Sequence, residues 1–184
     1  MKIPVQLEPA QGAPREQRTV EYRWDRDTEI LSAQLAAPNS RDSRDSGGSR
    51  DDGETTSESV GVEGTDGSWL ILDVAAGAIS GVEIAVWPEI LARSALSPPA
   101  AVEDADARLT TKGPRGGLAS LETETHLIAE ADGDQRTFHF RLGSPAARPA
   151  RTIRLGRDLL LDVDDKSHIS GLWLLNVPPC PTEP

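Results

Sequence analysis

Two stretches of the chain repeat one pattern: WLILDVAAGAISGVEI at residues 69–84 and LLLDVDDKSHISGLWLL at residues 159–175. In each, an apolar strand ends in Asp-Val, and a turn leads to Ile-Ser-Gly and a second apolar strand. Asp73 aligns with Asp162. Alternation of apolar and polar residues with a period of two is typical of a half-buried β-strand. We therefore expect the same two-stranded unit to occur twice.

The repeat extends toward the N-terminus of each copy. WDRDTEILSAQL (24–35) aligns with ADGDQRTFHFRL (131–142) without a gap, and VGVEG (60–64) matches IRLG (153–156). An Asp-x-Asp turn followed by alternating apolar residues indicates a tight turn that leads into a strand, because Asp carboxylates accept hydrogen bonds from turn N–H groups. Three matched segments in the same order indicate a tandem duplication.

The predicted fold class is all-β with minor α: two tandem antiparallel β-meander repeats packed as one pseudo-two-fold unit. One such meander alone would bury too little apolar surface to be stable. PEILARSAL (88–96) begins with Pro and could add one short helix against a sheet face. The predicted strands are 20–24, 29–35, 60–64, 69–74 and 79–87 in the first copy, and 124–131, 136–142, 151–155, 158–163 and 168–177 in the second.

Changes in composition divide the chain into repeats and connecting segments. An insertion at 39–59 in the first repeat has no apolar residue and is predicted to be disordered. The expected organisation is an N-terminal tail (1–19), repeat 1 (20–96), a linker (97–120), repeat 2 (121–178) and a C-terminal tail (179–184).

The 184 residues carry a net charge of −11. A surface this acidic repels nucleic-acid phosphates and favours a basic protein partner. The single Cys180 allows no internal disulfide, and no Cys/His cluster suggests zinc. The N-terminal residues lack the apolar segment of a signal peptide. We therefore expect a cytoplasmic protein that binds no membrane and no nucleic acid, a monomer with an internal pseudo-dimer.

The strand patterns separate a core face from a second face. Leu70 and Leu72 alternate with Trp69 and Asp73, so the two pairs lie on opposite faces. Trp173 stands in the second copy where the first has Glu83. Trp173 either packs between the copies or lines a ligand pocket, and the pattern favours packing. The residues predicted to form an interaction or inter-repeat face are Trp69, Glu83, Trp87 and Trp173.

The segment DVDDKSH (162–168) contains the weak candidates for a metal site. Asp162, Asp164 and Asp165 could hold a hard cation through carboxylate oxygens. An EF-hand loop needs more ligands and a distal Glu, which are missing here. A solvated turn is the preferred interpretation, with no metal and no cofactor.

Catalytic residues are not evident. Ser167 and His168 follow Asp162, but no GxSxG nucleophile motif is present. His139 alternates with Phe138 and Phe140 and is predicted to be a surface residue. We therefore predict that the chain is not an enzyme.

The segments YRWDRDTEILSAQL and LILDVAAGAISGVEI resemble the short bacterial domain-of-unknown-function family 2283 over most of residues 20–87 and 126–177. The resemblance implies a small all-β module, usually present as a single copy, and implies no activity. Ala75 and Trp173 depart from the family's acidic positions. The matching residues are Tyr22, Asp25, Leu31, Leu72, Asp73, Gly81, Val82, Glu83 and Ile84 in the first copy, and Asp132, Phe138, Leu161, Asp162, Asp164, Gly171 and Leu172 in the second.

The function favoured by these observations is a non-enzymatic protein-interaction or scaffold module that binds a basic protein. A small-molecule or cation binding protein that uses the groove between the repeats is the alternative. An unidentified enzyme comes third.

Overall fold

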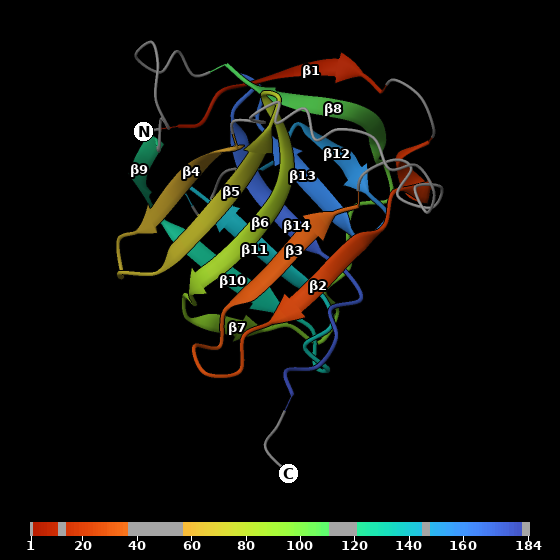
Figure 1. The fold of residues 1–184 in the computed structure, drawn as a ribbon. Helices are drawn as coiled ribbons and strands as arrows, with labels where there is room; N and C mark the ends of the chain where they lie inside the picture. The colour runs from red at the N-terminus through yellow and green to blue at the C-terminus, as the bar shows by residue number, and fades with distance from the viewer. Residues whose placement is uncertain (1, 11–13, 37–56, 111–120, 145–147, 182–184) are drawn as a thin grey trace, which may run out of the picture.

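The computed structural model describes residues 2–10, 14–36, 57–110, 121–144 and 148–181. These residues form fourteen strands and a single three-residue 3-10 helix, which confirms the all-β prediction (Figure 1). The first eight strands and the helix are β1 (Val5–Pro9), η1 (Arg15–Gln17), β2 (Val20–Trp24), β3 (Leu31–Leu35), β4 (Ser57–Gly64), β5 (Trp69–Ala75), β6 (Ala78–Val86), β7 (Ile90–Ala92) and β8 (Glu103–Leu109). The remaining strands are β9 (Leu121–Thr125), β10 (Leu127–Ala131), β11 (Phe138–Leu142), β12 (Arg151–Gly156), β13 (Leu159–Val163) and β14 (Ile169–Leu174).

Strand pairing follows the same order in both copies. The first copy pairs as β2-β3-β6-β5-β4 and the second as β10-β11-β14-β13-β12. Asp73 pairs with Gly81, and Asp162 pairs with Gly171. The register shifts directly after each of these Asp residues. Similar sequences therefore form the same local structure.

This order differs from the predicted meander. In a meander β3 would pair with β4, but β3 pairs with β6, and in the second copy β11 pairs with β14. A tight turn forces consecutive strands to pair, whereas the longer connections 36–56 and 143–150 permit β4 and β12 to lie beyond the next two strands. Consequently β6 and β14 are central in their sheets and bonded on both edges.

The two copies face each other across one core. The sheet curls so that the first copy lies in front and the second behind in Figure 1. The inward side chains Leu31, Leu70, Phe140 and Leu172 are each 0% exposed. Complete burial of such side chains from both copies supplies the core that one copy lacks.

Aromatic residues of the first copy also bind the second copy by polar contacts. The Tyr22 hydroxyl lies 2.8 Å from the Leu175 carbonyl oxygen and 3.1 Å from that of Asp158. The Trp24 indole N–H donates to the Pro178 carbonyl at 2.9 Å. These contacts satisfy polar groups at the edge of the apolar core.

One continuous stretch of chain joins the two copies. His126 alone separates β9 from β10. Strand β9 pairs in parallel with β4 of the first copy, while β10 pairs with β11 of the second. On the other side, β8 pairs with β12 and contacts β6 through Ala78.

The predicted helix at 88–96 is wrong. Residues Ile90–Ala92 form β7, which pairs in parallel with Ala129–Ala131. Pro at the first position permits a helix, but this segment also lies at the open edge of β10, where strand pairing satisfies its backbone groups. None of the described residues belongs to a helix long and apolar enough to cross a membrane.

The predicted tail and linker contain ordered strands. The span 1–19 includes β1 and η1, and the span 97–120 includes β8. Strands β1 and β8 pair with each other over five residues. Strand β1 alternates Val5 and Leu7 with polar residues, whereas β8 alternates only the small residues Ala105 and Ala107. Their mutual pairing and the burial of Ile3 and Val5 stabilise both strands.

Two further predicted segments are only partly covered by the residues that the structure describes. Of the insertion 39–59, residues 57–59 belong to β4, and 39–56 lie outside the described residues. Of the C-terminal tail 179–184, residues 179–181 form no strand, and 182–184 lie outside the described residues.

Candidate functional site

Each copy has one face toward the shared core and one face away from it, called here the outer face. Equivalent strand positions on the two outer faces carry different side chains. Ser32 pairs with Glu83 in the first copy, and His139 pairs with Trp173 at the same place in the second. The equivalent pairs, first copy then second, are Arg23 and Glu130, Ser32 and His139, Asp73 and Asp162, and Glu83 and Trp173.

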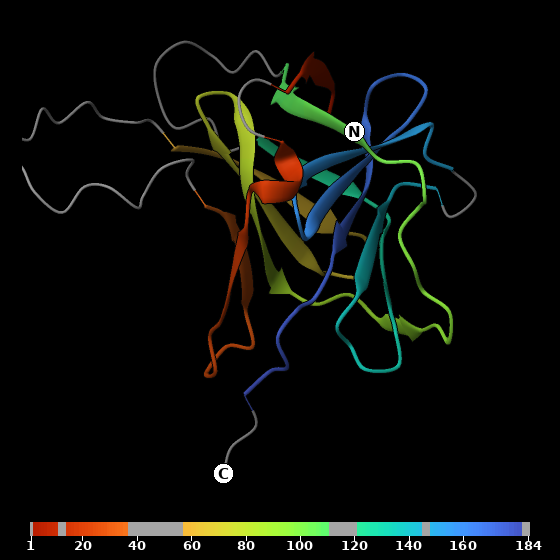
Figure 2. The same ribbon diagram turned by 90° about the vertical axis from the view of Figure 1, so that its right-hand side faces the viewer.

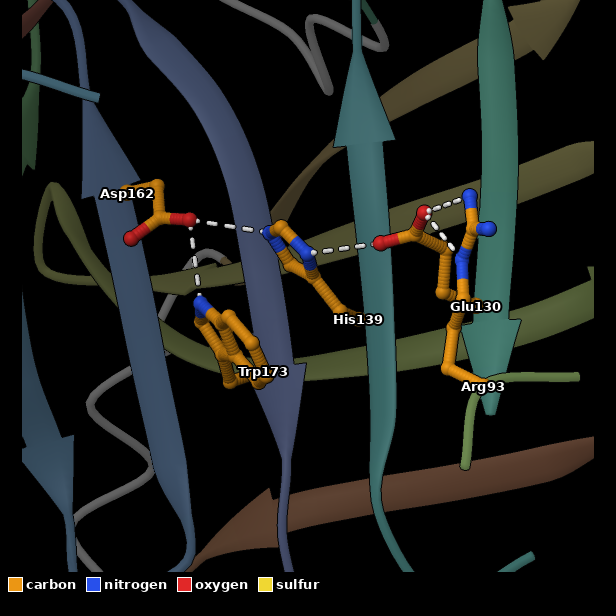
Figure 3. A network of polar contacts seen from close by, with 5 residues as sticks. All are labelled: Arg93, Glu130, His139, Asp162 and Trp173. Atoms are coloured by element: carbon orange, nitrogen blue, oxygen red, sulfur yellow. Dashed lines mark hydrogen bonds and ion pairs between the residues drawn. The ribbon is translucent and has the colours of Figure 1, made fainter. Parts of the chain in front are cut away.

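The outer face of the second copy holds a buried polar network centred on Asp162 (Figure 3). Asp162 is 1% exposed. Its Oδ2 lies 3.0 Å from His139 Nε2 and accepts a 3.0 Å hydrogen bond from Trp173 Nε1. Its Oδ1 accepts a 2.7 Å hydrogen bond from the Thr152 hydroxyl. A single carboxylate thus satisfies three polar side chains from β11, β12 and β14.

The network continues on the other side of His139. His139 Nδ1 lies 3.5 Å from Glu130 Oε2. Arg93 donates to Glu130 Oε1 from Nη2 at 2.6 Å and from Nε at 2.9 Å. Burial raises the pKa of Glu130, but the hydrogen bonds and charge of Arg93 outweigh it and hold this pKa below its usual value. A carboxylate therefore lies on each side of the imidazole.

Packing fixes the imidazole further. The His139 and Trp173 rings stack with centroids 3.9 Å apart and an interplanar angle of 8°. A Cβ atom at Gly171 would lie 3.1 Å from His139 Nε2 and 3.2 Å from Asp162 Oδ2, so glycine leaves room for their contact. Both ring nitrogens therefore face carboxylates, one from β13 and one from β10.

The prediction that His139 is a surface residue is wrong, since its side chain is only 12% exposed. Trp173 stacks on its ring, and Asp162 and Glu130 lie beside its two nitrogens. The segment 93–102, which was predicted to be partly helix and partly linker, begins with Arg93, which binds Glu130. It connects β7, bonded to β10, with β8, bonded to β12. It therefore runs along the outside of the second copy, as Figure 2 shows. The apolar residue Trp173 at the position of Glu83 was the available signal that this face is covered.

The outer face of the first copy is acidic. Within the described ranges, the side-chain donors to Asp73 and Glu83 are neutral: Gln34 donates to Asp73 at 2.6 Å and Ser32 donates to Glu83 at 3.1 Å. Among the residues that the structure describes, no ion pair forms at Glu21, Glu63, Asp73, Glu83 or Glu122. Among the residues of β2 to β6 and β9 that the structure describes, Arg23 is the one basic residue on this face. The strand registers place six acidic residues on it: Glu21, Glu63, Asp73, Glu83, Glu122 and Glu124.

A half-buried indole lies within this acidic outer face. Trp69 crosses Gly61 of the neighbouring strand, where an added Cβ would lie 2.8 Å from Trp69 Cζ2. Ile71 follows on the same face of β5. The first copy thus presents an aromatic and aliphatic strip among carboxylates.

The structure separates the four residues predicted for the interaction or inter-repeat face. Trp69 and Glu83 lie on the outer face of the first copy, and Trp173 lies on that of the second. Trp87 faces the shared core, where it stacks on Trp24 at 5.7 Å and contacts Phe138 at 5.3 Å. Period-two alternation placed Trp87 with Glu83, but Trp87 lies beyond the end of β6 and does not follow its alternation.

The three Asp residues considered for metal binding do not converge. Asp162 belongs to the buried network, and Asp165 is exposed. Asp164 accepts hydrogen bonds from the backbone N–H groups of Lys166 and His168, both at 2.9 Å, and pairs with Lys2 at 2.7 Å. Within the described part of the chain, no group of three or more His, Cys, Asp or Glu residues could hold a metal ion.

A small pocket lies where β9, which pairs with β4, meets the second copy and the N-terminal segment. Its volume is about 90 Å³. The space between the copies is instead filled by the apolar core. The pocket lining includes Lys2, Thr123, Thr125, Ser144, Asp164 and Ser170.

No protein-family model and no curated protein matches this chain. The resemblance to family 2283 therefore remains a prediction.

Proposed function

We propose that this chain is a non-enzymatic interaction module that acts in the cytoplasm and binds a basic, extended segment of a partner protein. The binding surface is the acidic outer face of the first copy. The observation that carries the proposal is charge without compensation, because five of the six carboxylates there have no cationic partner among the described residues. In the second copy, by contrast, Glu130 is paired with Arg93.

The chemistry of this face fits lysine and arginine side chains. Carboxylates on neighbouring strands attract cationic groups and raise the rate of association with a basic partner. The indole of Trp69 can stack against a guanidinium or an alkyl-ammonium group, an interaction of about 0.5–1 kcal/mol at an exposed site. Ile71 adds apolar contact for the aliphatic part of such side chains.

The second copy supports an extended ligand. There, the chain's own segment 93–102 runs along the equivalent outer face (Figure 2). An extended chain is therefore accommodated by this sheet architecture. On the first copy, we propose that the extended segment of the partner lies along the outer face in the position that 93–102 has on the second copy.

Isothermal titration calorimetry with a lysine-rich peptide of about ten residues tests the proposal. We expect saturable binding that weakens as salt is added, since salt screens exposed charges. The double variant Asp73→Asn, Glu83→Gln should bind roughly 3–10-fold more weakly, because each exposed ion pair contributes about 0.2–1 kcal/mol.

The matched control is Glu89→Gln, which removes one exposed carboxylate away from this face. Glu89→Gln should bind like the unsubstituted protein. The single variants Asp73→Asn and Glu83→Gln each remove one carboxylate, as Glu89→Gln does. If Glu89→Gln loses as much peptide affinity as either of them, net charge alone attracts the peptide. That outcome would contradict a defined binding face.

The other predicted functions have less support. The groove between the repeats is filled with core side chains, so a small molecule has less room there than expected. The buried His139 network offers no free nitrogen for catalysis, which weakens the case for an enzyme.

A further inference from the structure

An irregularity at the end of β6 turns one apolar side chain to the outer face of the first copy. Ile84 of β6 is buried in the core, so strict alternation would direct Val86 to the core as well. The register with β5 skips Ala85, however, because Leu70 pairs with Ile84 and Trp69 pairs with Val86. An extra residue in one strand redirects the side chains that follow it. Val86 therefore lies beside Trp69 on the outer face, where it is 50% exposed.

Three apolar side chains occupy neighbouring positions on this face of β5 and β6. The Trp69 indole extends over Gly61 of β4, where an added Cβ would lie 2.8 Å from Cζ2. Ile71 pairs with Gly61, so it lies next to this indole. Val86 lies on the other side of Trp69, and the Cβ atoms of two such opposed residues are about 5 Å apart. We call Trp69, Ile71 and Val86 the apolar patch.

Carboxylates surround the apolar patch. Glu63 of β4 pairs with Trp69, and Glu83 of β6 pairs with Ile71. Glu122 of β9 pairs with Gly61, beneath the edge of the indole. Among the described residues, none of these three carboxylates forms an ion pair. An aromatic and aliphatic centre with a charged rim is typical of a protein interaction site.

The charge of this rim determines which occupant fits the apolar patch. A second copy of this chain, placed face to face on the first, would bring like carboxylates together, which is unfavourable. A segment with basic residues alone would neutralise the rim but would bury little of Ile71 and Val86. A segment that has both basic and aliphatic side chains matches the rim and the centre.

We propose, building on the function proposed above, that the basic segment of the partner carries a bulky aliphatic residue between two basic residues. Every second side chain of an extended segment faces the sheet, and two such side chains are about 7 Å apart. The aliphatic side chain packs on Trp69 and Val86. The basic side chains before and after it pair with Glu63 and Glu83, which lie on opposite sides of β5.

Two lysine-rich peptides of equal charge test this preference by isothermal titration calorimetry with the full chain. One peptide has Leu at its central position, and the other has Ser there. The Leu peptide should bind about 3–10-fold more tightly, as expected for partial burial of one aliphatic side chain. This ratio should stay nearly constant as salt is added, because salt weakens the ionic contacts that both peptides share.

The outcomes separate this inference from the proposed function. If both peptides bind with equal affinity, the basic binding face stands and the aliphatic preference is refuted. If neither peptide binds, the proposed function itself is refuted. Since this comparison uses the unsubstituted protein, it stays decisive even if a variant fails to fold.

Val86→Ser should lower the Leu-to-Ser affinity ratio by about twofold or more, because it removes one apolar side of the patch. The matched control is Ile90→Ser. Ile90 is also exposed, at 38%, but it lies on β7 beside β10 of the second copy. Ile90→Ser should therefore keep the full ratio. An equal fall in both variants, or no fall in Val86→Ser, would contradict the assignment of the apolar patch.

Discussion

Asp162 and Asp73 occupy the same strand position in the two copies, and their replacement by alanine should have very different costs. In Asp162→Ala, Thr152 and Trp173 lose the acceptor of their hydrogen bonds. These two residues are 4% and 5% exposed, so water cannot readily replace the carboxylate. A buried donor left without a partner costs about 1–3 kcal/mol.

The two donors together give a cost of about 2–6 kcal/mol. The alanine variant no longer has to bury a carboxylate, which offsets part of that cost. We therefore expect Asp162→Ala to lower the free energy of unfolding by about 2–4 kcal/mol. Asp73 accepts one hydrogen bond, from the exposed Gln34. Water can replace that bond, so Asp73→Ala should cost less than about 1 kcal/mol.

Urea unfolding followed by tryptophan fluorescence and by circular dichroism measures both variants. The reasoning predicts a clearly lower midpoint for Asp162→Ala and a nearly unchanged midpoint for Asp73→Ala. Equal midpoints would refute it, because they would mean that the network around His139 contributes no stability beyond that of an exposed side-chain pair.

Two further predictions concern pH. Burial raises the pKa of Tyr22, the chain's single tyrosine. The stability that its neutral phenol contributes is present below the ordinary tyrosine pKa of about 10 and is lost as the pH rises above that value. The absorbance at 295 nm should therefore show no ionisation near pH 10, and a titration there would contradict the burial of this hydroxyl. The lowered pKa of Glu130 contributes stability above its ordinary value of 4.5, and this contribution is lost as the pH falls. Arg93→Gln removes the main cause of the lowered Glu130 pKa. The urea midpoint of this variant should therefore fall less between pH 6 and about pH 3.5 than that of the unsubstituted protein. Identical pH dependence would show that Arg93 does not stabilise this carboxylate.

The sequence predicted the strands of both copies well because their apolar side chains alternate strongly. The predicted face of Leu70 and Leu72 is the core face, and the Asp turns form as expected: Asp25 Oδ1 accepts the Asp27 N–H, and Asp132 Oδ1 accepts those of Arg136 and Thr137. These features depend on neighbouring residues alone, so local pattern is sufficient for them.

The features that the sequence did not predict depend on contacts between distant segments. EDADARL (103–109) has only small apolar residues in alternation before Leu109, and it becomes β8 through pairing with β1 and β12. The order of strands depends on connections that local pattern does not restrict. His139 is mostly buried because Trp173, Asp162 and Glu130, from three other strands, enclose its ring, and nothing near residue 139 indicates these contacts. The placement of Trp69 and Glu83 on one face was predictable, whereas the absence of ion pairs at Asp73 and Glu83 among the described residues depends on which strands lie beside them.

The most direct test of the proposed function is a ¹H–¹⁵N NMR spectrum of the four tryptophan indole N–H groups during titration with the lysine-rich peptide. The indole N–H groups of Trp24 and Trp87 donate to the Pro178 and Glu29 carbonyls, and that of Trp173 donates to the Asp162 carboxylate. Trp69→Phe identifies the remaining signal. Binding at the acidic face predicts that the Trp69 signal shifts with peptide concentration while the other three stay in place. A shift confined to Trp173 or Trp87, or no shift at Trp69 under conditions where calorimetry detects binding, would contradict it.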